Sequence, residues 1–96
     1  LGEADGQFNT PQAATADIHN NIYVADGLNN RIQKFTADGK FVRKWGRAGT
    51  AQGEFDLPIG VTADLDGHVF VLDSNNHRVQ VFTARGAFVR SWGSNG

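Results

Sequence analysis

Two short polar patterns in this chain combine acidic, amide and basic side chains at a fixed spacing. The candidate binding residues that they supply are Asp26, Asn29 and Arg31, then Asp73, Asn76 and Arg78. Such groups on loops could hold a polar ligand. The same residue types also hydrogen-bond nearby backbone amides in turns, and an arginine pairs with a carboxylate beside it. Because a catalytic residue is needed only once, the repetition of this pattern favours a scaffolding role.

Metal ligation is the second chemistry that the residue types allow. The segment Ala63–His68 places two acids, Asp64 and Asp66, at the spacing that opens a calcium-binding loop. It lacks the further ligands and the closing glutamate of such a loop, so a hairpin turn is the favoured interpretation. The only histidines are His19, His68 and His77, and no two of them have zinc-site spacing. The sequence therefore predicts no metal and no cofactor.

Enzyme motifs are also missing. Neither a glycine-rich phosphate loop of the GxGxxG type nor a GxSxG nucleophile turn occurs, and no cysteine is present to act as a nucleophile. We therefore expect a protein that is not an enzyme.

Aromatic and basic residues could together suggest a nucleic-acid surface. Trp45, Trp92 and several phenylalanines recur at equivalent places in predicted strands, which favours packing over base stacking. A group of basic side chains in the first half could form a weak anion-binding patch: Lys34, Lys40, Arg43, Lys44 and Arg47. A solvated strand edge is the simpler interpretation. The net charge of −1 gives no overall bias, so nucleic acid is not a predicted partner.

Length and hydropathy set the scale of the molecule. The 96 residues are 40% hydrophobic and 20% charged, which predicts one small folded unit with no membrane span. The absence of methionine and the opening Leu1 favour an excised or engineered segment. The cellular compartment stays open.

An internal repeat organises the whole chain. Shifting the sequence by 47 residues pairs 1–49 with 48–96 without a gap, and 23 of these 49 pairs are identical. The repeat predicts two units, residues 1–48 and 49–96.

Each unit reads as four short strands rich in β-branched and aromatic residues. The predicted strands are Ala13–Asp17, Ile22–Asp26, Arg31–Thr36 and Lys40–Trp45, with second copies at Gly60–Asp64, Val69–Asp73, Arg78–Thr83 and Ala87–Trp92. Asn, Asp and Gly between the strands suit tight hairpins, so each unit is predicted to be a four-stranded antiparallel sheet. Four strands in a repeat of this length are typical of a β-propeller blade. The predicted fold class is all-β.

The run "GEFDLPIGVTADLDGHVFVLDSNNHRVQVF" resembles the NHL repeat, which has a P-x-G-V-x-x-D turn, a strand ending in Asp, and an N-x-R before an apolar strand. The first copy matches with Ala13 in place of Gly60, and it resembles the extracellular sensor propellers of bacterial receptor serine/threonine kinases. The resemblance implies a six-bladed ring that serves mostly as a protein-binding and sometimes an RNA-binding platform. Some lyases of this kind hold zinc through histidines spread over several blades, and no matching motif occurs here.

Two blades cannot close a ring. Residues 22–25 and 69–72 are apolar at every position, which predicts that both faces of each blade are covered. We therefore expect head-to-tail self-assembly into a closed ring, with a homotrimer of six blades favoured over two or four copies. The alternatives are a protein- or peptide-binding module cut from a larger NHL sensor, with a site on Asp26–Arg31, Asp73–Arg78 and Gly46–Pro58, and, less favoured, a lyase or hydrolase propeller.

Overall fold

A computed structural model describes residues 4–93, and it contains two antiparallel sheets of four strands each. The first sheet runs β1 (Pro11–Ala16), β2 (Ile22–Asp26), β3 (Arg31–Phe35) and β4 (Phe41–Trp45). The second runs β5 (Pro58–Ala63), β6 (Val69–Asp73), β7 (Arg78–Phe82) and β8 (Phe88–Gly93). Spatial order follows chain order in both sheets, so each is a simple meander. This confirms the prediction of an all-β chain with two four-stranded antiparallel units.

The predicted strands differ from the observed ones by at most two residues at either end. Two single turns of 3-10 helix were not predicted: η1 (Gly27–Asn29) and η2 (Ser74–Asn76) fill the second connection of each sheet. Each ends at a residue in the left-handed region, Asn30 at φ 54° and His77 at φ 55°. The sequence predicts only turns at these connections, because three residues are too few to show a helical period.

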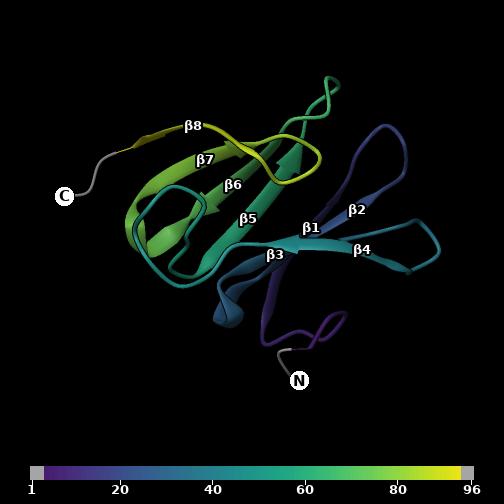
Figure 1. Cartoon of the computed structure of the whole chain (residues 1–96), viewed down its shortest axis with the longest axis horizontal. Coiled ribbons are helices and arrows are strands. Elements are labelled where there is room, and N and C mark those ends of the chain that lie inside the picture. Colours follow the sequence, from purple (N-terminus) through teal and green to yellow (C-terminus); the bar gives the residue numbers. More distant parts are fainter. Residues whose placement is uncertain (1–3, 94–96) are drawn as a thin grey trace.

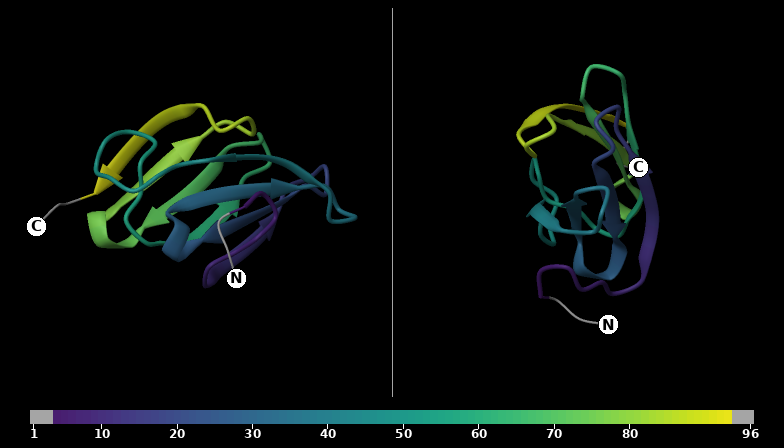
Figure 2. Two further views of the ribbon diagram at one scale, coloured as in Figure 1. Left: turned by 60° about the horizontal axis from the view of Figure 1, so that its bottom comes forward. Right: turned by 90° about the vertical axis from the view of Figure 1, so that its right-hand side faces the viewer.

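The two sheets lie side by side, and strands β1 and β2 of the first sheet pack against β5 of the second (Figure 1, Figure 2). A single apolar core fills the space between them. From the first sheet it receives Tyr23, Ala25 and Ile32, which have no exposed surface. The second half contributes a larger set, namely Phe55, Val69, Val71 and Phe82. The core of the molecule is thus the junction between the two blades.

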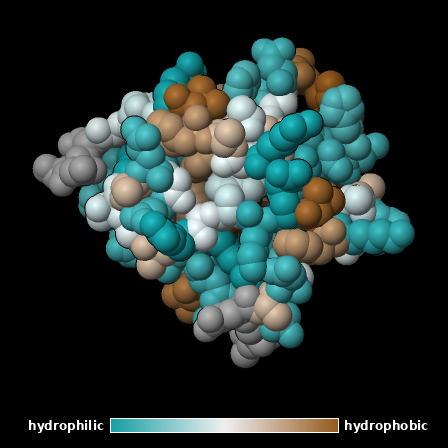
Figure 3. Space-filling model, viewed as in Figure 1, coloured by the Kyte–Doolittle hydropathy of each residue, from teal (hydrophilic) through white to brown (hydrophobic). Residues whose placement is uncertain are grey.

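The opposite face of each blade has no such cover. In β6, Val69 and Val71 are fully buried, whereas Leu72, between Val71 and Asp73, is 43% exposed. Trp92 in β8 is 50% exposed, although its repeat counterpart Trp45 packs against the core. Brown and tan apolar side chains accordingly interrupt the hydrophilic surface in Figure 3. Both faces of these strands are apolar, as the sequence shows, but within one chain one face of each blade remains open.

Among the described residues, no helix has the length and apolar character needed to cross a bilayer.

Candidate functional site

The first polar pattern forms a buried network at the end of β2. Asp26 has no exposed surface, and its Oδ2 accepts hydrogen bonds from Arg31 Nε at 2.9 Å, Asn29 Nδ2 at 3.0 Å and Gln33 Nε2 at 3.3 Å. Its Oδ1 accepts a bond from the backbone N–H of Asn9 at 2.7 Å. The carboxylate is thus surrounded by donors from its own blade, as a buried charge requires.

The second pattern repeats this arrangement around Asp73. Its Oδ2 accepts from Arg78 Nε at 2.9 Å, Asn76 Nδ2 at 3.0 Å and Gln80 Nε2 at 3.3 Å. Its Oδ1 accepts from the backbone N–H of Asp56 at 2.7 Å. The four distances equal those around Asp26, so the 47-residue repeat preserves the network donor by donor.

These networks hold the segment that enters each blade. Arg31 Nη2 donates to the carbonyls of Ala4 and Gln7, while Gln33 donates to Gln7 and accepts from the backbone N–H of Gly6. In the second copy, the corresponding bonds run from Arg78 and Gln80 to the segment 50–54. The geometry supports the scaffolding interpretation of the six candidate residues. Ligand binding by Asp26, Asn29, Arg31, Asp73, Asn76 and Arg78 stays a prediction.

Gln33 and Gln80 belong to these networks, although neither was predicted as a site residue. Each is buried in a β-strand where a polar side chain needs a partner. Their identity at repeat-equivalent positions was the available signal, because the adjacent positions vary between the copies, as Ile32/Val79 and Lys34/Val81.

Most of the basic residues of the first half each contact a different acceptor within the chain. Lys34 is nearly buried and donates to the carbonyl of Ala84 at 2.9 Å. Lys44 Nζ lies 2.5 Å from Asp5 Oδ1, and Arg47 Nε lies 2.8 Å from Glu54 Oε2. Arg43 also donates to the carbonyl of Arg85 at 3.2 Å, so four of the five cations of the expected patch have partners within the chain, which reduces the charge that they offer to an anion.

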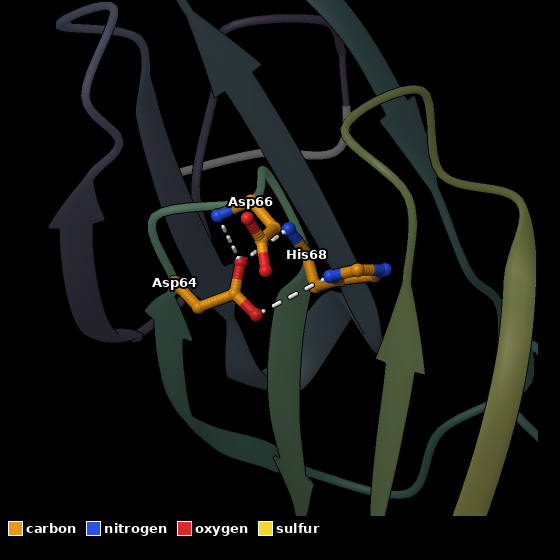
Figure 4. A group of neighbouring side chains, drawn as sticks. All are labelled: Asp64, Asp66 and His68. Atoms are coloured by element: carbon orange, nitrogen blue, oxygen red, sulfur yellow. Dashed lines mark hydrogen bonds and ion pairs between the residues drawn. The ribbon is translucent and has the colours of Figure 1, made fainter.

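Asp64, Asp66 and His68 bring one potential metal ligand each to the hairpin between β5 and β6, with these atoms within 4.8 Å of one another (Figure 4). Asp64 Oδ1 already accepts backbone N–H bonds from Asp66 at 2.9 Å and His68 at 2.8 Å, and Oδ2 lies 3.2 Å from His68 Nδ1 (Figure 4). These backbone bonds, with that of His68 foremost, hold the pKa of Asp64 below its usual value.

The first blade has the same turn without a second acid. Asp17 Oδ1 accepts from the backbone N–H of His19 at 2.9 Å and of Asn21 at 3.0 Å. Because Asp17 makes the turn in the same way as Asp64, turn formation alone explains the acid at this position. His68 is the only histidine that joins a potential ligand group among the residues 4–93.

Aromatic rings pack against one another at the junction between the blades. Trp45 from β4 lies 5.6 Å from Phe82 in β7, measured between ring centroids, and Phe82 lies 5.7 Å from Phe55. In the first blade, Phe8 and Phe35 repeat the second of these pairs at 5.7 Å. No tryptophan of the described chain packs on Phe35 as Trp45 packs on Phe82. An apolar groove lined by Phe8, Ile22, Phe35 and Gly39 lies there instead.

Comparison with known proteins identifies the repeat. Residues 55–82 match the family model described as NHL repeat. Protein brain tumor from Drosophila melanogaster is 39% identical over 49 residues, which are 51% of this chain and 5% of that protein. The matched segment lies in the second half, with which the first half shares 23 identities in 49 pairs.

Solved structures share the arrangement of the strands. A putative exported protein from Bacteroides fragilis matches with a TM-score of 0.76 and 20% identity over 97% of this chain. Virginiamycin B lyase from Staphylococcus aureus matches with a TM-score of 0.68 and 19% identity over 90%. This chain spans only 27% of the length of each. At such identities the likeness concerns the fold, and it agrees with propeller blades.

Proposed function

Because the chain carries two NHL-repeat blades, we propose that it is a non-catalytic building block that associates head to tail with further copies of itself into a closed β-propeller. The preferred ring contains three copies and six blades. This number rests on the resemblance to six-bladed NHL propellers, and it lies within the four to eight blades that closed propellers use.

One observation carries the proposal: the two open faces are the repeat counterparts of the two faces that already pack together inside the chain. Trp45 and Phe82 meet at the internal junction, and their counterparts Trp92 and Phe35 lie on opposite open faces. A second copy placed by the same rotation brings Trp92 onto its neighbour's Phe35. Repeating a head-to-tail contact closes a ring when the rotation fits.

Burial of apolar surface supplies the driving force. The outer face of the second blade holds an apolar groove lined by Gly60, Val61, Thr62, Phe70, Leu72 and Val79. Covering such a face removes apolar surface from water, which contributes roughly 25 cal/mol of favourable free energy for each Å² buried. At the internal junction the equivalent contact buries side chains completely, since Tyr23 and Val71 retain no exposed surface. We expect similar burial where two copies meet.

Mass in solution tests the proposal. Size-exclusion chromatography with light scattering, and native mass spectrometry, should give a single species of about three times the 10.4 kDa chain mass. A well-folded monomer over the accessible concentration range would overturn self-association. A stable ring of two or four copies would support self-association but overturn the proposed number of three copies.

A further inference from the structure

At one edge of the internal junction, an arginine side chain of the first blade contacts the backbone of an arginine of the second blade. Arg43 in β4 donates from Nη1 to the backbone oxygen of Arg85 at 3.2 Å. Arg85 is exposed and lies in the turn between β7 and β8. The contact is a hydrogen bond from a side chain to a backbone oxygen, and it joins two positions that both carry positive side chains.

The repeat changes the sign of one of these charges at the open faces. Arg90 in β8 is the counterpart of Arg43, and Asp38 in the turn between β3 and β4 is the counterpart of Arg85. Placing a second copy as the internal blades are placed brings Arg90 to the Asp38 turn of the neighbour. The open faces therefore have charge complementarity that the internal junction lacks.

The aromatic contact has a prepared place beside this charge pair. Gly86 accommodates Trp45 so closely that a Cβ added to it would lie 2.7 Å from Trp45 Cε3. Its counterpart Gly39 has nothing within 4 Å of the same position, and it lines the open apolar groove. The half-exposed Trp92 has the guanidinium of Arg90 over its ring at 5.7 Å, so both side chains lie at the same edge.

We infer that the partner of the open faces is a second copy of this chain, joined by Trp92 in the Phe8–Phe35–Gly39 groove and by an ion pair from Arg90 to Asp38 of the neighbour. This inference rests on the proposed self-association and adds its contact residues. The ion pair makes the junction between copies electrostatically distinct from the junction within a chain. High salt should therefore weaken the junction between copies by screening this pair, and the position of the pair selects the register of docking.

Charge reversal tests the pairing directly. The variants Arg90→Asp and Asp38→Arg each place like charges at the junction, so the ring should dissociate at about tenfold higher concentration or more. The double variant restores opposite charges and should recover assembly. Native mass spectrometry over a dilution series measures both effects, and circular dichroism checks the fold. Both side chains are exposed, so neither change removes a core contact.

Arg85→Asp is the matched control, because it makes the same kind of change at the equivalent turn of the other blade. The Arg85 backbone oxygen meets Arg43 within the chain and not at an open face, so this change should leave the dissociation of the ring unchanged. If the unmodified ring forms but Arg90→Asp and Asp38→Arg act independently or not at all, the proposed contact is wrong while self-association stands. If the unmodified chain is a folded monomer, both the proposed function and this contact are overturned.

Discussion

The indole of Trp45 packs against the ring of Phe82, and this contact joins two blades that share no backbone hydrogen bonds in their sheets. Trp45 also lies edge-on to Tyr23 in its own blade, at 6.3 Å between centroids. One side chain therefore bridges the two halves of the core.

Replacing Trp45 by alanine should destabilise the chain itself. Trp45 packs against the core, and removing a packed tryptophan leaves a cavity that typically costs about 3 kcal/mol of unfolding free energy. Urea denaturation followed by circular dichroism measures this loss. Trp92→Ala is the matched control, because the same change on an open face should weaken assembly and have a smaller effect on unfolding of the dissociated chain. Equal effects of the two variants on that unfolding would contradict the assignment of Trp45 to the internal junction.

Asp26→Ala should also be strongly destabilising. It removes the acceptor for Arg31, Asn29 and Gln33 and leaves a nearly buried guanidinium without its carboxylate, which typically costs about 3–5 kcal/mol. Thermal or urea unfolding gives the magnitude. Asp5→Ala is a suitable control, since its ion pair with Lys44 is about half exposed and should contribute less than about 1 kcal/mol. Similar losses for the two variants would argue against a structural role for the Asp26 network.

The sheets were predictable from the sequence because residues such as Tyr23, Val24 and Ala25 repeat as Phe70, Val71 and Leu72 between turn residues. That pattern specified strands, their order and apolar character on both faces. It did not specify which face meets the other blade, because Leu72 and Val71 are both apolar although only Val71 is buried. That choice depends on how the whole sheets dock.

The polar residues were predictable in kind but not in detail. Asp26 and Arg31 were expected to pair, as they do, because a carboxylate and a guanidinium five residues apart flank a single turn. Their bonds to residues 4–9 were not predictable, since these join positions more than 15 residues apart. The role of Gln33 was missed for the same reason.

Divalent metals should not stabilise this chain. Asp64 Oδ1 is engaged by two backbone donors, and Asp17 forms the same turn with Asn21 in place of His68. We expect the melting temperature to stay constant when Ca²⁺ or Zn²⁺ is added after treatment with a chelator. An increase that disappears in Asp66→Asn would instead show that the hairpin binds metal. Asn20→Asp, in the hairpin of the first blade that lacks a second acid, controls for general effects of charge.

Acid should destabilise the first blade through Asp17. Burial raises the pKa of this carboxyl, but hydrogen bonds from the Asn21 backbone, the Tyr23 hydroxyl and the His19 backbone together outweigh burial and leave the pKa below its ordinary value of 3.8. The charged form is thus favoured in the folded state. Its stabilising contribution is complete above the unfolded pKa and is lost as pH falls through the lower folded value.

Melting temperatures between pH 6 and about pH 2 measure this contribution, since that interval spans the ordinary pKa of aspartate. Asp17→Asn should be less stable than the unmodified chain at pH 6, and the difference should shrink as pH falls below about 4. Tyr23→Phe removes the 2.9 Å bond to Asp17 Oδ2 and should retain part of the acid sensitivity, because the backbone donors remain. A stability difference between Asp17→Asn and the unmodified chain that is constant across this range would contradict the proposed role of the Asp17 charge.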